Sequence, residues 1–140
     1  MSYRKKIVWG IISSMVGFFA SMVLAKPEIF GLCDMGDKKC IYFFIDYFDN
    51  VAKFIFAFSV SFFIIFTMLS FIDESVFNYW KKFAKIFLSI AIILIIITPT
   101  QHGGFVGIDK ELSTWFLAIA FLIISLGIII WKSVSLKKGN

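Results

Sequence analysis

Two cysteines form the residue pair with the clearest chemistry. Cys33 and Cys40 are close in the sequence, and Gly36 between them allows a turn that brings the sulfurs together. In an oxidising compartment such a pair forms a structural disulfide. The alternative is a redox pair that exchanges electrons with a soluble thiol protein. Passing those electrons onward requires a second pair, and the chain has no third cysteine and no Cys-x-x-Cys. We therefore expect a disulfide, with redox activity as the less favoured interpretation.

The other groups that could carry chemistry do not form a recognisable site. His102 is the single histidine, and two cysteines with one distant histidine fall short of a tetrahedral zinc set. The glycines that follow His102 lack the Gly-Lys-Ser/Thr ending of a phosphate loop. The acids of the same region as the cysteines do not have calcium-loop spacing; they are Asp34, Asp37, Asp46 and Asp49. We expect no metal site, no cofactor and no catalytic residues.

The rest of the chain is dominated by long apolar runs. Hydrophobic residues make up 60% and aromatic residues 19%, and the mean hydropathy is +0.92. Residues 86–97 are apolar on every helical face except at Ser89, whereas a helix of a soluble bundle alternates an apolar stripe with a polar face. The predicted fold is therefore all-α, a single integral membrane four-helix bundle. Its spans are residues 7–25, 51–72, 83–98 and 112–131; outer loops are 26–50 and 99–111, and the inner loop is 73–82.

The distribution of basic residues predicts the orientation. The two ends and the inner side carry most of them: Arg4, Lys5, Lys6, Lys81, Lys82, Lys85, Lys132, Lys137 and Lys138. By the positive-inside rule both termini are cytoplasmic. Heavy use of Phe, Ile and Lys favours a bacterium, and hence its plasma membrane. The formal net charge of +5 does not indicate nucleic acid, because these lysines flank apolar runs instead of forming a basic stripe. Residues 1–25 also resemble a cleavable signal peptide, although their apolar stretch is longer than usual.

Two further features concern the membrane boundary. Residues 41–50 are rich in aromatic side chains, which predicts a short interfacial helix in the first outer loop or an extension of the second span. Asp49 and Lys53 have the i, i+4 spacing of an ion pair on such a helix. We interpret the four tryptophans as interfacial anchors and not as ligand-stacking groups; they are Trp9, Trp80, Trp115 and Trp131.

Small residues recur where helices could approach one another. Ser13, Gly17 and Ser21 are spaced by four in the first span, and Ala57 and Ser61 in the second. Deep inside the spans there is no ionisable side chain of the kind that pumps and proton-coupled transporters need.

The hypothesis that follows is a small accessory, assembly or immunity-type subunit without catalytic machinery. It would act through helix–helix and outer-loop contacts, with the lipid bilayer, a second copy or another membrane protein as partner. An oligomeric pore or small-solute transporter is the first alternative, and a thiol-disulfide oxidoreductase using Cys33 and Cys40 is the second.

Overall fold

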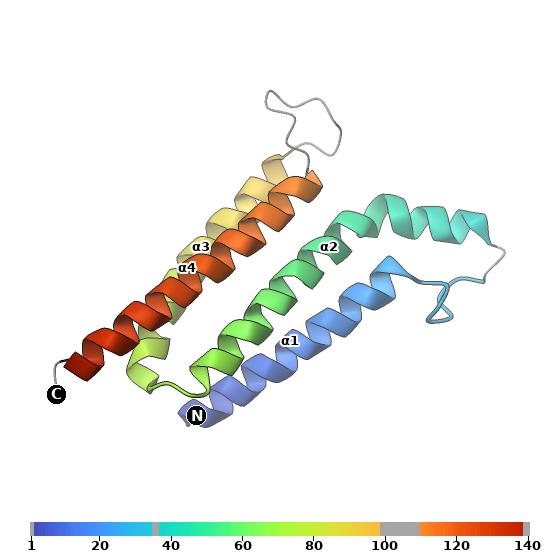
Figure 1. Ribbon diagram of the computed structural model, residues 1–140. Coiled ribbons are helices and arrows are strands. Elements are labelled where there is room, and N and C mark those ends of the chain that lie inside the picture. Colours follow the sequence, from blue (N-terminus) through green and yellow to red (C-terminus); the bar gives the residue numbers. More distant parts are fainter. Residues whose placement is uncertain (1, 35–36, 99–109, 139–140) are drawn as a thin grey trace.

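The computed structural model describes residues 2–34, 37–98 and 110–138, and these form helices without a strand. The helices are α1 (Tyr3–Ala25), α2 (Lys38–Leu69), α3 (Glu74–Ile97) and α4 (Lys110–Lys138). The predicted all-α class is confirmed. The start of α1, the α2–α3 turn and the end of α4 lie together at one end of the molecule, which we call the terminal end (Figure 1). The opposite end, where α1 finishes and α2 begins, is called the disulfide end.

All four helices are longer than the predicted spans, and α2 and α3 begin well before them. Residues 41–50 are the first turns of α2 itself, and Figure 1 shows this part bending away from the rest of the helix. Residues 74–82, expected within the inner loop, are the first turns of α3. Neither stretch contains Gly or Pro, so nothing in the sequence interrupts the backbone hydrogen bonding. Residues 99–109, most of the second predicted outer loop, lie outside the described residues.

Three of the described helices are long and apolar enough to cross a membrane: α1, α2 and α4, the last over Glu111–Leu136. Helix α3 does not meet this standard of length and hydropathy. Its uncharged part, residues 86–97, is roughly 18 Å long at the helical rise, whereas the hydrocarbon core of a bilayer is about 30 Å thick. Three lysines, Lys81, Lys82 and Lys85, precede that part.

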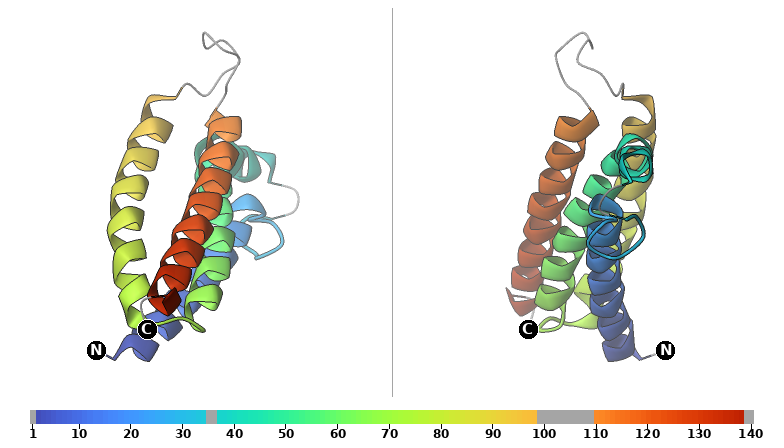
Figure 2. Two further views of the ribbon diagram at one scale, coloured as in Figure 1. Left: turned by 60° about the vertical axis from the view of Figure 1, so that its left-hand side comes forward. Right: turned by 90° about the vertical axis from the view of Figure 1, so that its right-hand side faces the viewer.

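The main helix contacts are those of α1 with α2, α2 with α4 and α4 with α3 (Figures 1 and 2). The contact between α1 and α2 is close because α1 presents small residues there. A Cβ atom at Gly10 would lie 2.5 Å from the ring of Phe66, and one at Gly17 would meet the hydroxyl of Ser59. Ser14 and Ser21 are buried in the same contact, and Ser13 is exposed beside it.

The contact between α2 and α4 also uses small residues. Ala57 and Ser61 of α2 are buried there, as is Ala118 of α4. The Ser61 hydroxyl donates to the Ala57 carbonyl at 3.0 Å and lies 3.3 Å from the Ala118 carbonyl. A hydroxyl that bonds inside its own helix can be buried without water. The structure therefore places four of the five small residues from the sequence in helix contacts.

An aromatic core joins α2, α3 and α4. The ring of Phe121 in α4 is fully buried, with its centroid 5.2 Å from that of Phe62 in α2 and 5.3 Å from that of Phe87 in α3. Trp80 belongs to this core, being only 3% exposed. Its indole N–H donates to the Ser125 hydroxyl at 3.1 Å. Trp80 thus differs from the expected interfacial anchor, while the other three tryptophans, Trp9, Trp115 and Trp131, are exposed.

At the terminal end, the start of α1 closes over the α2–α3 turn. The Tyr3 hydroxyl lies 2.6 Å from the Leu69 carbonyl and 2.8 Å from the Ile72 carbonyl. Lys6 forms an ion pair with Glu74 at 3.0 Å. The ion pair is substantially exposed and is worth about 0–1 kcal/mol, so the tyrosine contact is the more specific link between α1 and the turn.

The two mid-helix glycines Gly10 and Gly127 give a matched test of the α1–α2 contact. Replacing Gly with Ala in an exposed helix stabilises it by about 0.5–1 kcal/mol. Gly127 has nothing within 4 Å of an added Cβ, so we expect Gly127→Ala to be neutral or stabilising. Gly10→Ala should instead destabilise the protein by about 1–3 kcal/mol through overpacking against Phe66. Reversible unfolding of both variants in mixed micelles measures the difference, and two changes of the same sign would contradict the described packing.

Candidate functional site: the disulfide-closed segment

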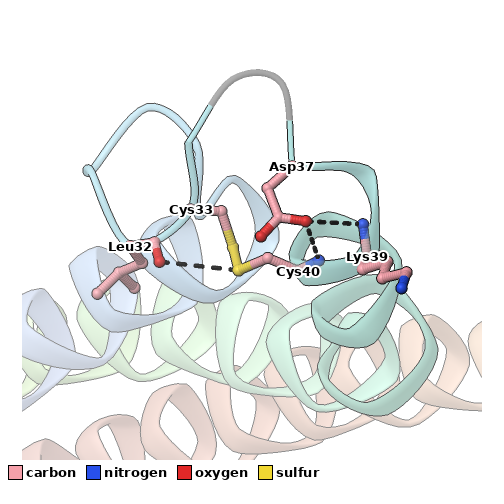
Figure 3. Close-up of a disulfide and its surroundings, with 5 residues drawn as sticks. All are labelled: Leu32, Cys33, Asp37, Lys39 and Cys40. Carbon is pink, nitrogen blue, oxygen red and sulfur yellow. Dashed lines mark hydrogen bonds between the residues drawn. A yellow bond between two sulfur atoms is a disulfide. The ribbon is translucent and has the colours of Figure 1, made fainter.

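Cys33 and Cys40 are joined by a disulfide at the disulfide end (Figure 3). Their Cα atoms are 5.8 Å apart, within the usual range for a bridged pair. Cys33 is buried, and Cys40 lies in the first turn of α2. The bridge therefore ties the chain that follows α1 to the beginning of α2. We call residues 26–34 with Cys40 the disulfide-closed segment.

Backbone and side-chain hydrogen bonds hold the same region. The carboxylate of Asp37 accepts from the backbone N–H groups of Lys39 at 3.1 Å and Cys40 at 3.2 Å, which caps the start of α2 (Figure 3). The Leu32 N–H donates to the Pro27 carbonyl at 2.9 Å. Gly31 has a φ of +72°, a conformation that favours glycine. The Cys40 sulfur lies 3.7 Å from the Leu32 carbonyl; a bonded sulfur carries no hydrogen, so this is a packing contact.

The disulfide-closed segment presents apolar side chains at its surface. Ile29 is 63% exposed, Leu32 52% and Phe30 49%. Large apolar residues held outward by a covalent bridge and a network of turns are characteristic of a contact surface, since they contribute no core of their own. Asp34 and Lys26 are exposed beside them.

An ion cluster next to the segment joins α2 to α4. Lys53 lies 2.8 Å from the Asp49 carboxylate and 2.7 Å from that of Glu111. The predicted i, i+4 pair of Asp49 and Lys53 is confirmed. The sequence could not indicate Glu111 as a second partner, because that contact depends on how α4 packs. The three groups are partly exposed, so each pair contributes at most about 1 kcal/mol.

The sequence also contains candidate residues other than the two cysteines. His102 and the glycines 103, 104 and 107 lie outside the described residues. Within the part of the chain that is described, no group of three or more His, Cys, Asp or Glu residues is placed to hold a metal. Among those same residues, every buried side-chain nitrogen or oxygen has a hydrogen-bond partner.

Comparison of the chain with protein-family models, with curated proteins and with solved structures found no match. The site is therefore interpreted from its own geometry. The arrangement is a covalently closed segment with exposed apolar side chains and a charged cluster beside it.

The double substitution Cys33→Ser with Cys40→Ser tests the bridge. By the chain-entropy relation, removing a cross-link that closes a loop of this length lowers the free energy of unfolding by about 2–3 kcal/mol. We expect a lower unfolding midpoint for the double variant in detergent than for the oxidised wild type. The wild type treated with reductant is the control and should approach the variant. Equal midpoints for the oxidised wild type and the variant would show that the bridge does not stabilise the fold.

Proposed function

We propose that this chain is a four-span protein of a bacterial plasma membrane with both termini in the cytoplasm. We further propose that it is an accessory, assembly or immunity-type subunit that acts by contact and has no catalytic machinery of its own. The observation that carries the proposal is the outward placement of its large apolar side chains, both along the helices and on the disulfide-closed segment.

The outward placement of many large apolar side chains supports the membrane assignment. In the most apolar stretches, only 17% of α1, 33% of α2 and 28% of α4 is buried inside the structure. The buried residues include small ones, such as Ala57 and Ala118, whereas Phe116 and Ile123 of the same α4 helix point outward. Water would penalise such a surface by roughly 25 cal/mol for each Å² of apolar area. Hydrocarbon carries no such penalty, and small residues at helix contacts are typical of membrane proteins.

The chain direction supports a crossing by α3 as well. α2 finishes at the terminal end and α4 begins at the disulfide end, so α3 runs from one end to the other beside α4 (Figure 2). Lys85 is exposed in the middle of α3, directly before the uncharged part of the helix. A lysine at the edge of an apolar stretch can extend its ammonium toward the headgroups. With that extension and local thinning of the bilayer, a short apolar helix can span.

The exposed basic residues of the terminal end support a cytoplasmic location for this end of the molecule. Lys5 and Arg4 of α1 are exposed there, as are Lys81 and Lys82 of α3. The positive-inside rule favours the cytoplasm for such a set. The disulfide-closed segment then lies on the outer side, where an oxidising environment maintains disulfides.

A partner surface is available on α3, which packs against α4. Ile86, Ile90, Ile93 and Ile97 recur at helical spacing and are all more than half exposed. A face of this kind fits a neighbouring transmembrane helix of another subunit or of a second copy. The serines that would line a pore have less support, because the hydroxyls of Ser61 and Ser125 are bonded within the chain.

Single cysteine substitutions test the topology, since Cys33 and Cys40 are bridged and do not react with maleimides. Asn78 and Ser135 are exposed at the terminal end, and Asp46 is exposed on the first turns of α2. In intact cells we expect a membrane-impermeant maleimide to label Asp46→Cys. Asn78→Cys and Ser135→Cys should react only after permeabilisation. Labelling of Asn78→Cys and Ser135→Cys from opposite faces would contradict the four-span arrangement.

Photo-crosslinking tests the contact function. A photoreactive residue at Ile93, or at Phe30 of the disulfide-closed segment, should yield a discrete crosslinked protein band in the native membrane. The matched control is the same residue at Ala91, which is fully buried on α3 and should crosslink within the chain. If Ile93 and Phe30 give only lipid adducts while the protein remains monomeric, the accessory-subunit proposal fails.

A further inference from the structure

A hollow of about 450 Å³ lies at the disulfide end, bounded by the end of α1, the disulfide-closed segment, α2 and α4. Its walls include the small residues Ser21, Ala25 and Ala52, and its edge includes Lys26, Phe30 and Trp115. The hollow exists because the facing surfaces of α1 and α2 carry small side chains here, while the larger residues stand around them.

The interior of the hollow is apolar. Ser21 is 2% exposed, and its hydroxyl donates to the Phe18 carbonyl at 2.6 Å, so it offers no free polar group to an occupant. The ring of Phe56 continues the wall toward Trp115, with 6.3 Å between the ring centroids. Such a surface recognises hydrocarbon and not a polar solute.

The edge of the hollow carries two lysines in different electrostatic states. Lys53 is paired with two carboxylates, Asp49 and Glu111, so its ammonium is not free for a ligand and the cluster has a formal charge of about −1. Lys26 is exposed directly after α1, and no carboxylate among the described residues lies within ion-pair distance of its ammonium. An uncompensated cation beside an apolar hollow complements a molecule with a hydrocarbon chain and an anionic head.

We propose that this hollow binds one acyl chain of an anionic phospholipid, with the lipid phosphate on the ammonium of Lys26. The site is at the boundary where the apolar part of α1 ends, which is the level of the headgroups if α1 spans. The proposal rests on the membrane placement given under Proposed function and is independent of any protein partner. A bound lipid of this kind would fill the space between the end of α1 and the part of α2 that contains Ala52 and Phe56.

Trp115 is a natural reporter of the hollow, because bromine on an acyl chain quenches tryptophan fluorescence on contact. The full chain is reconstituted in phosphatidylcholine vesicles that contain a small, equal share of either brominated phosphatidylglycerol or brominated phosphatidylcholine. The difference between the wild type and Trp115→Phe gives the signal of Trp115. We expect brominated phosphatidylglycerol to be preferred about two- to fivefold, the factor that one near-surface lysine contributes.

Two variants change the site in different ways. Lys26→Gln should abolish the preference between the two lipids, while Lys38→Gln, which removes an exposed lysine outside the hollow, should keep it. Ala25→Leu should reduce quenching of Trp115 by both brominated lipids because it fills the hollow. Ala20→Leu, on the exposed part of α1, should not.

The outcomes separate this proposal from the previous one. Equal quenching of wild-type Trp115 by the two lipids, or equal losses in Lys26→Gln and Lys38→Gln, would overturn the lipid site and leave the membrane assignment intact. Absence of quenching at every tryptophan would overturn both, because it would mean that no helix lies in the bilayer.

Discussion

The close approach of helices to the two sides of α2 is the contact on which the rest of the structure depends. In the membrane setting that we propose, apolar side chains gain little by meeting one another, since the lipid is equally apolar. Association then comes from tight packing. On one side Gly10 and Gly17 admit Phe66 and Ser59 of α2; on the other, Ser61 reaches the backbone of α4. These small residues set the spacing of α1, α2 and α4, and the larger side chains fill the space that remains.

The same setting explains where the hydroxyl groups bond. Ser14, Thr67, Ser89 and Thr98 each donate to the carbonyl four residues earlier, at 2.7 to 3.0 Å. A backbone carbonyl in the helix is the partner that needs neither water nor another chain. The indole N–H of Trp80 donates to the Ser125 hydroxyl of α4. The hydroxyls named here therefore bond within their own helix, and Ser61 and Ser125 also take part in contacts between helices.

The sequence was sufficient for the helical class, the apolar runs and the cysteine pair, because each depends on composition or on neighbours in the chain. The sequence was less informative about which side of each helix faces its neighbours. A spacing of four advances about 40° beyond a full turn at each step, so Ser13, Gly17 and Ser21 drift across the helix. The buried line follows Gly10, Ser14, Gly17 and Ser21, which alternates steps of four and three. Trp80 shares its helical face with Val76 and Ala84, a signal of burial that its lysine neighbours obscured. Glu111 as the partner of Lys53 required the packing of α4.

The two ends of the molecule differ in how firmly they are closed, and this bears on where recognition takes place. At the terminal end Tyr3 and one exposed ion pair connect α1 with the α2–α3 turn. At the disulfide end a covalent bridge, a capped helix start and a three-group ion cluster fix the chain. Binding costs free energy for each group that must be ordered. The disulfide and the turn hydrogen bonds restrict the backbone of the disulfide-closed segment, so a contact made there loses less backbone entropy than one made by a free loop. This favours the disulfide end as the surface that distinguishes one neighbour from another, while the helix faces supply area without selectivity.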